Sequence, residues 1–186
     1  MEDHEIVALY WARDEKALSE TAQKYGNYCT HIAVNILGSA ADAEECVNDT
    51  YLSAWNSIPP HRPKQLSTFL GKLVRNLSIN RYKQEHAQKR GGHETALILD
   101  ELSEIVSGCE DVEDSVAERE LIGAVNSFLT GLPADKRFLF LRRYWYSDSV
   151  SAIAAQTGRT ENAVSVELNR IRRKLRDYLR ERGYAL

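Results

Sequence analysis

Long apolar runs are missing from this sequence. The longest, Ile6 to Ala12, has seven residues, far fewer than the roughly 20 needed to span a bilayer. No basic start followed by an apolar stretch and a small-residue cleavage site occurs, so we expect no signal peptide. With 27% charged and 43% hydrophobic residues, the composition favours a soluble globular protein over a membrane-spanning, secreted or disordered one.

Cysteine is scarce as well. Cys29, Cys46 and Cys109 are an odd number and form no C-x-x-C pair, so neither a disulfide framework nor structural zinc is expected. The five histidines have no metal-binding spacing, and the sequence has neither a glycine-rich phosphate loop after a strand nor a nucleophile elbow. We therefore expect no cofactor, no metal, no catalytic residue and no enzymatic activity. A reducing cytoplasm is the simplest location.

Strand patterns are almost absent, and helical periodicity takes their place. Apolar residues recur at intervals of three and four over 43–58 and 69–77, which is the spacing of one helix face. Further helices are predicted over 6–12, 17–25, 28–37, 116–128, 138–144 and 149–157, and from 160 onward. The predicted fold class is all-α.

Charge and helix-breaking residues divide the chain into two predicted domains. Residues 94–131 contain ten acids and one base, whereas 132–186 contain twelve bases and six acids. An earlier zone, 62–90, contains eight bases and one acid, and Gly91-Gly92 ends it. We predict a helical domain over 1–90, an acidic flexible linker over 91–114 and a second helical domain over 115–186. Both basic zones favour phosphate binding.

The second domain contains a helix-turn-helix pattern. Apolar residues flank Gly158 on both sides, as the crossing of two helices at a tight turn requires. Thr160 is a suitable N-cap for the helix that follows. A simple helical hairpin has the same pattern, but the basic residues over 170–176 favour DNA binding.

Three motifs occur along the chain in a defined order. Residues 42–55 are DAEECVNDTYLSAW, residues 69–77 are FLGKLVRNL, and the third motif runs from Leu132-Pro133 through Arg142-Arg143-Tyr144 and Gly158 to Leu175. In this order and at this separation they resemble the motifs of extracytoplasmic-function sigma factors, the smallest class of bacterial RNA polymerase sigma subunits. The first is similar to the family's core-binding helix, D-A-E-D-x-V-Q-E-T-F-x-x-A-W. The second is similar to the helix that melts and reads the minus-ten promoter element, and the third to the module that reads the minus-thirty-five element.

The resemblance implies a protein that binds core RNA polymerase and directs promoter-specific transcription initiation. Its implied partners are core polymerase and promoter DNA, with an anti-sigma protein as a further candidate and no membrane. Core polymerase is expected to contact the exposed positions of the first motif. These are Asp42, Glu45, Asn48 and Asp49, which an ordinary solvated helix face would also explain.

Promoter melting requires a base to leave the stack and be held by polar groups, with cations on the phosphates. Asn76 and Asn80 are four residues apart, so both side chains leave one side of a helix and could bind a base edge. A hydrogen bond from Asn76 to the preceding loop is the alternative. The family usually has Trp where this sequence has Phe69. The predicted minus-ten contacts are Lys72, Arg75, Asn76, Asn80 and Lys83.

The predicted recognition helix differs from the family in having no cation near its start, where the family usually has Lys or Arg. Glutamate can accept from cytosine N4 and asparagine can pair with adenine, so base readout is still possible. Affinity would then come mainly from arginines on phosphates. The predicted minus-thirty-five contacts are Arg159, Thr160, Glu161, Asn162, Ser165, Glu167, Asn169, Arg170, Arg172 and Arg173.

Two other classes of protein compete with this interpretation. A stand-alone helix-turn-helix regulator would explain the second domain, but not the basic helix over 72–83 or the core-binding motif. A helical adaptor would leave both basic zones unexplained. The acids Glu110, Asp111, Glu113 and Asp114 also suggest that the linker covers a basic zone in the free protein and weakens DNA binding, although a merely solvated linker has the same composition.

Overall fold

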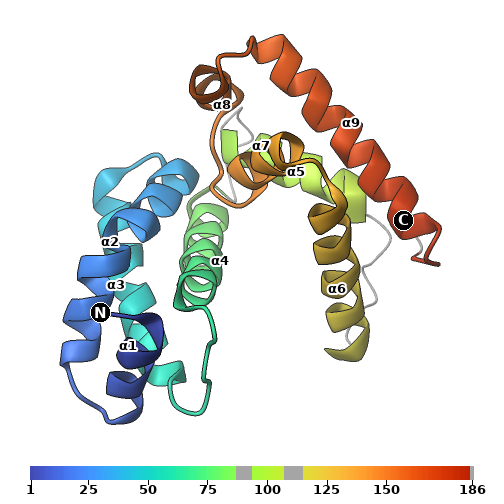
Figure 1. The fold of residues 1–186 in the computed structure, drawn as a ribbon. Coiled ribbons are helices and arrows are strands. Elements are labelled where there is room, and N and C mark those ends of the chain that lie inside the picture. Colours follow the sequence, from blue (N-terminus) through green and yellow to red (C-terminus); the bar gives the residue numbers. More distant parts are fainter. Residues whose placement is uncertain (87–93, 107–114, 185–186) are drawn as a thin grey trace. The chain divides into compact units, whose positions relative to one another are not determined.

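A computed structural model of the 186-residue chain describes residues 1–86, 94–106 and 115–184. These residues form nine α-helices and no strand (Figure 1). The predicted all-α class is confirmed. The chain divides into two compact units, Met1–Gly91 and Gly92–Leu186.

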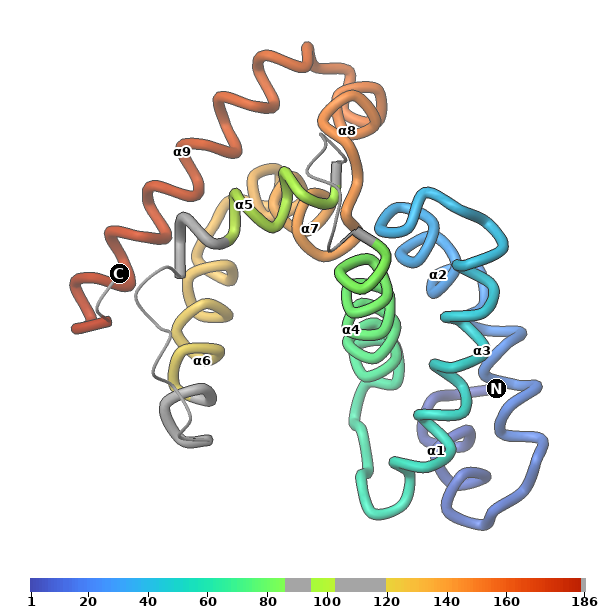
Figure 2. Tube along the Cα trace, turned by 180° about the vertical axis from the view of Figure 1, so that it is seen from behind, coloured from blue at the N-terminus to red at the C-terminus, as the bar shows by residue number. Residues whose placement is uncertain are grey.

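The first unit is a bundle of four helices. They are α1 (Asp3–Trp11), α2 (Lys16–Leu37), α3 (Ala40–Ser57) and α4 (Leu66–His86). The long helix α2 packs against both α3 and α4, which also contact each other, and α1 packs on α2 (Figure 2). Ile32, Ile36, Leu70 and Val74 are fully buried, so the apolar stripes of α2 and α4 meet in one core.

Helix α2 corrects one sequence prediction. Two short helices were expected over 17–25 and 28–37, but a single helix runs through Gly26 and ends at Gly38, which has a left-handed φ of 71°. A glycine inside a helix costs up to about 1 kcal/mol relative to alanine. Burial of Ala17, Cys29 and Ile32 along the same helix outweighs that cost.

Asp3 fastens the start of the chain to two other helices. Its Oδ1 accepts a hydrogen bond from Lys24 Nζ over 2.8 Å, and its Oδ2 accepts one from the backbone N–H of Leu66 over 3.0 Å. The carboxylate therefore lies at the N-terminus of α4, where the helix dipole favours a negative charge. This contact places α1 beside the loop that precedes α4.

The second unit contains α5 (Glu94–Val106), α6 (Ser115–Gly131), α7 (Ala134–Tyr144), α8 (Val150–Thr157) and α9 (Glu161–Arg180). Helix α9 contacts each of the other four helices. Its apolar face, with Val164, Leu168, Ile171 and Leu175, forms the centre of the core. Leu139 of α7 and Ile153 of α8 complete it.

Helix α5 corrects the predicted linker. Residues 91–114 were expected to be flexible throughout, but Glu94–Val106 is helical and contacts α7 and α9. Ile98 is only 2% exposed within the core of the second unit. Ile98 and Leu102 are four residues apart, and this short apolar stripe is obscured in the sequence by the surrounding acids. The acids Glu110, Asp111, Glu113 and Asp114 lie outside the described residues, so their role stays a prediction.

Among the described helices, none is both long and apolar enough to cross a bilayer.

Candidate nucleic-acid interface

An exposed polar stripe runs along α4. Lys72, Asn76, Asn80 and Lys83 are all exposed and follow one another at intervals of four, four and three residues. Such spacing keeps side chains on one face of a helix. The opposite face carries the buried Leu70 and Val74. The structure therefore brings together four of the five residues predicted to bind the minus-ten element. We call them the α4 stripe.

Arg75 is the exception among these five. Its side chain is half-buried rather than exposed. Burial lowers the pKa of its guanidinium, and the nearby Tyr28 acts in the opposite direction. At 100° per residue, Asn76, Asn80 and Lys83 lie to one side of Lys72 and Arg75 lies about 60° to the other side. The contact of Arg75 with DNA stays a prediction.

The positions predicted to contact core polymerase separate into two pairs on α3. Arg81 of α4 reaches across to Asp42 and Glu45, with nitrogen–oxygen distances of 2.7 Å to each. The hydrogen bonds to Glu45 and Glu85 raise the pKa of Arg81. Asp42 and Glu45 therefore both belong to an ion-pair cluster between α3 and α4, although the Glu45 side chain is 63% exposed. Their contact with core polymerase stays a prediction.

Asn48 and Asp49, the other pair, are exposed on α3. Next to them lies a hollow of about 630 Å³ whose lining includes Asn48, Leu52 and Trp55. Leu52 is 58% exposed, which is unusual for a leucine in the middle of a long helix. Sequence reasoning missed it, although its position four residues after Asn48 was a signal that it shares this face.

The start of α9 is shaped by a tight turn. Gly158 has a left-handed φ of 64° at the end of α8, a conformation that glycine adopts without a steric penalty. The Thr160 hydroxyl accepts a hydrogen bond from the N–H of Ala163 over 3.2 Å. The predicted N-cap is confirmed. Four of the predicted base-reading positions are exposed beyond it, namely Glu161, Asn162, Ser165 and Asn169.

Glu167 does not share this exposure. Its carboxylate forms ion pairs with Lys136 of α7 at 2.8 Å and with Arg170 at 3.6 Å. The hydrogen bond from Lys136 lowers the pKa of Glu167. With its side chain only 15% exposed, Glu167 holds α9 against α7, and its role in base readout stays a prediction.

The predicted phosphate-binding arginines separate in the same way. Arg170 is 68% exposed on its side chain and Arg173 is also exposed. Arg159 pairs with Asp135 at 3.0 Å on the surface. Arg172, in contrast, has a side chain only 13% exposed. It lies within the second unit, and its contact with DNA stays a prediction.

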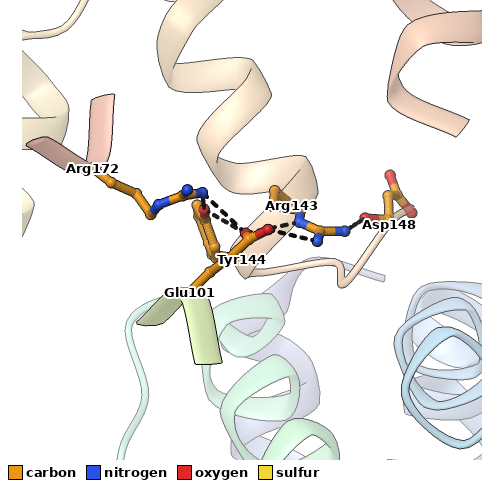
Figure 3. A network of polar contacts seen from close by, with 5 residues as sticks. All are labelled: Glu101, Arg143, Tyr144, Asp148 and Arg172. Carbon is orange, nitrogen blue, oxygen red and sulfur yellow. Dashed lines mark hydrogen bonds and ion pairs between the residues drawn. The ribbon is translucent and has the colours of Figure 1, made fainter. Parts of the chain in front are cut away.

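Arg172 belongs to a buried polar network that Figure 3 shows from close by. Its Nη1 donates to the Tyr144 hydroxyl over 2.8 Å and lies 3.2 Å from Glu101 Oε2. Arg143 donates two hydrogen bonds to the same carboxylate, over 2.9 and 3.1 Å, and a third to the carbonyl oxygen of Asp148. Burial raises the pKa of Glu101, but the hydrogen bonds from Arg143 and Tyr144 outweigh it, so the pKa is lowered. The network fastens α5 to α7 and α9.

No group of three or more His, Cys, Asp or Glu side chains that could hold a metal ion lies in the part of the chain that the structure describes.

Comparison with known proteins adds to this geometry. Residues 21–88 match the family described as sigma-70 region 2, a range that contains α3 and the α4 stripe. The chain is 24% identical over 203 aligned positions to the RNA polymerase sigma-H factor of Bacillus licheniformis, covering 100% of this chain and 90% of that protein. It is 25% identical over 161 positions to a Xanthomonas campestris pv. campestris protein named as the RNA polymerase sigma factor RfaY, covering 84% of this chain and 38% of that protein. The solved structure of CnrH in complex with the cytosolic domain of CnrY aligns with 96% of this chain and 97% of that chain, at 19% identity and a TM-score of 0.45.

Proposed function

We propose that this chain is an RNA polymerase sigma factor of the extracytoplasmic-function type, as the match of residues 21–88 to sigma-70 region 2 and the two sigma-factor relatives support, and that the α4 stripe binds the melted strand of the minus-ten element. The observation that carries this proposal is the exposure of Lys72, Asn76, Asn80 and Lys83 along one line of α4. No acidic residue occurs between positions 50 and 84, so α4 itself contributes no acid to the stripe, and the nearby Asp42, Glu45 and Glu85 are paired with Arg81.

Each residue type in the stripe suits one part of a nucleic-acid strand. The amides of Asn76 and Asn80 offer paired donors and acceptors to a base edge that is no longer in a duplex. Lys72 and Lys83, at the two ends, neutralise phosphates. The eleven residue steps from Lys72 to Lys83 span about 16 Å at 1.5 Å per residue. That length accommodates about five nucleotides at the 3.4 Å spacing of a stacked strand.

Core polymerase is the proposed partner of the α3 face. Asn48 and Asp49 supply polar contacts, and the exposed Leu52 beside the adjoining hollow supplies an apolar one. Central apolar anchors within polar rims carry much of the binding energy of protein interfaces. Asp42 and Glu45 support this face indirectly, because their ion pairs with Arg81 hold α3 against α4.

The second unit is the proposed reader of the minus-thirty-five element. The exposed side chains at the start of α9 face base edges in this proposal, and Arg170 and Arg173 bind phosphates. Arg159 joins them by exchanging its surface pair with Asp135 for a phosphate. A domain boundary near Gly91-Gly92 stays a prediction from the charge pattern and the glycine pair, and an anti-sigma partner stays a prediction of the family resemblance.

The decisive experiment separates promoter melting from core binding. Asn76→Ala/Asn80→Ala should impair open-complex formation on duplex promoter DNA, read by permanganate reactivity of unpaired thymines. Core polymerase affinity, measured by fluorescence anisotropy, should stay within about two-fold, because α3 is untouched. Asn27→Ala, an exposed asparagine on α2, is the matched control.

Equal loss of core binding in the double variant would make these asparagines structural and overturn the proposal. A stand-alone regulator is separated by a pull-down with core polymerase, which only a sigma factor requires.

A further inference from the structure

Arg13 has a backbone conformation that is rare for a residue with a side chain. Just past α1, the N–H of Arg13 donates to the carbonyl oxygen of Tyr10 over 3.1 Å. The N–H of Asp14 donates to the carbonyl oxygen of Leu9 over 3.0 Å. Together these two bonds form a Schellman helix end, in which the residue with left-handed φ is usually glycine. Arg13 occupies that position with a φ of 56°, so its side chain carries a steric cost that glycine would avoid.

The Arg13 side chain reaches the end of α3, 42 positions away in the chain. Its Nη1 donates to the carbonyl oxygen of Trp55 over 2.6 Å. In a continuing α-helix this carbonyl would accept from the N–H four residues on, but that residue is Pro59, which has no N–H. Helix α3 also has no basic residue in its last turn. Arg13 thus supplies both a donor and the positive charge that stabilises a helix C-terminus.

The same guanidinium lies over the Trp55 ring. Its carbon is 5.2 Å from the ring centre, which is a cation–π contact. The ring centres of Tyr10 and Trp55 are 6.1 Å apart, with an angle of 57° between the planes. Because Tyr10 is fully buried, the Trp55 indole is held by a fixed ring of α1 and by the Arg13 cation.

Trp55 in turn belongs to the face proposed to bind core polymerase. It lines the hollow of about 630 Å³ together with Asn48 and Leu52 of α3. Glu15 and Leu18, which follow Arg13 closely in the chain, line the same hollow. Arg13 therefore connects the Trp55 ring with the segment that supplies the rest of the lining.

We propose that Arg13 is a positioning residue for core polymerase binding, which fixes the Trp55 indole and the end of α3 so that the hollow is already formed in the free protein. The inference rests on the proposed function, since it names the residue that prepares the α3 face. A preformed surface loses less side-chain freedom on binding than one that is ordered by its partner. This role accounts for an arginine at a position that favours glycine, because strained residues persist where function uses them.

The test compares Arg13→Ala with Arg13→Gly in the full chain. Both variants lose the guanidinium, but only glycine relieves the left-handed φ. Both should weaken core polymerase binding about three- to ten-fold, measured by fluorescence anisotropy. The unfolding midpoint of the first unit should be about 4–8 °C higher in Arg13→Gly than in Arg13→Ala. Core affinity near the wild-type value in Arg13→Gly alone would make Arg13 merely structural and overturn the inference.

A double-mutant cycle with Trp55→Ala separates positioning from direct contact. If Arg13 acts through Trp55, then Arg13→Ala should change core affinity by less than about two-fold in a Trp55→Ala background. A full additional loss in that background would mean that Arg13 touches polymerase itself, which also overturns the inference. Lys16→Ala removes an exposed cation at the start of α2. It is the matched control and should keep the wild-type core affinity.

Leu52→Ala distinguishes failure of this inference from failure of the proposed α3 face. Wild-type core affinity in Arg13→Ala, together with a loss in Leu52→Ala, overturns the inference and leaves the α3 face in place. Wild-type core affinity in both Leu52→Ala and Trp55→Ala would count against the α3 face itself, and the inference would fall with it.

Discussion

At the scale of single residues, neighbouring arginines on α9 have different roles. Arg172 faces inward to Glu101 and Tyr144, whereas Arg173 is exposed. Adjacent side chains on a helix point about 100° apart, so Arg172 and Arg173 lie on different faces of α9. The basic sequence pattern predicts that both arginines contact DNA, but only Arg173 can reach a phosphate without breaking a buried ion pair.

The two arginines give a matched pair of variants. Arg173→Ala should reduce the slope of log K for duplex binding against log salt concentration by about one. It should leave the free energy of unfolding within about 0.5 kcal/mol of the wild-type value. Arg172→Ala should keep the slope and lower the free energy of unfolding by about 2 kcal/mol or more, because it strips a partner from a buried carboxylate. Salt titrations of DNA binding and urea unfolding measure the two effects, and a full slope change in Arg172→Ala would contradict the burial of its guanidinium.

Glu101 makes stability depend on pH. Its pKa is lowered in the folded state, so its contribution is complete above its ordinary pKa of about 4.3 and is lost as the pH falls through the folded value. We expect the wild type to lose stability below about pH 4.5. Glu101→Gln should be less stable at pH 7 and lose less on acidification. Urea unfolding from pH 7 to 3, with Glu181→Gln as an exposed control, measures this; parallel profiles for wild type and Glu101→Gln would refute it.

At the scale of elements, α5 shows how composition conceals structure. Four of its thirteen residues are acids and none is basic, yet Ile98 is buried and Glu101 is held by Arg143 and Arg172. One acid of the predicted linker therefore does pair with the basic C-terminal segment. It does so as a fixed ion pair within the second unit, and not as a mobile cover over an exposed basic surface.

The packing of α5 can be measured with neighbouring residues. Ile98→Ala should lower the free energy of unfolding of the second unit by about 2–4 kcal/mol, because it leaves a cavity in a core. Leu97→Ala should change it by less than about 0.5 kcal/mol, since Leu97 is half exposed. Thermal unfolding followed by circular dichroism checks both, and equal shifts would mean that α5 is not packed as described.

At the scale of the whole molecule, the chain consists of two units that each have a separate core. Ile32 and Ile36 lie in the first, and Leu139 and Leu168 in the second. The proposed contacts follow the same division, with the α3 face and the α4 stripe in one unit and α9 in the other.

Separate cores predict separate unfolding. Calorimetry of the full chain should resolve two transitions. Ile32→Ala should lower the midpoint of one transition and Ile98→Ala that of the other, because each removes buried surface from only one core. A single transition, lowered equally by both variants, would show that the units unfold together.

The sequence by itself determined the features that depend on near neighbours. Helical periodicity, the Thr160 cap, the left-handed glycines 38 and 158, and the shared face of Asn76 and Asn80 all follow from contacts within a few residues, and all are found in the structure.

Only the tertiary structure decided which charged residues are free to bind a partner. Arg75 and Arg172 lie in basic stretches, yet both turn inward, and Asp42 and Glu45 are occupied by Arg81. The contact of Arg13 with Trp55 likewise joins distant segments. The physical reason is that burial and ion pairing depend on residues brought together from distant parts of the chain, and no local pattern records them.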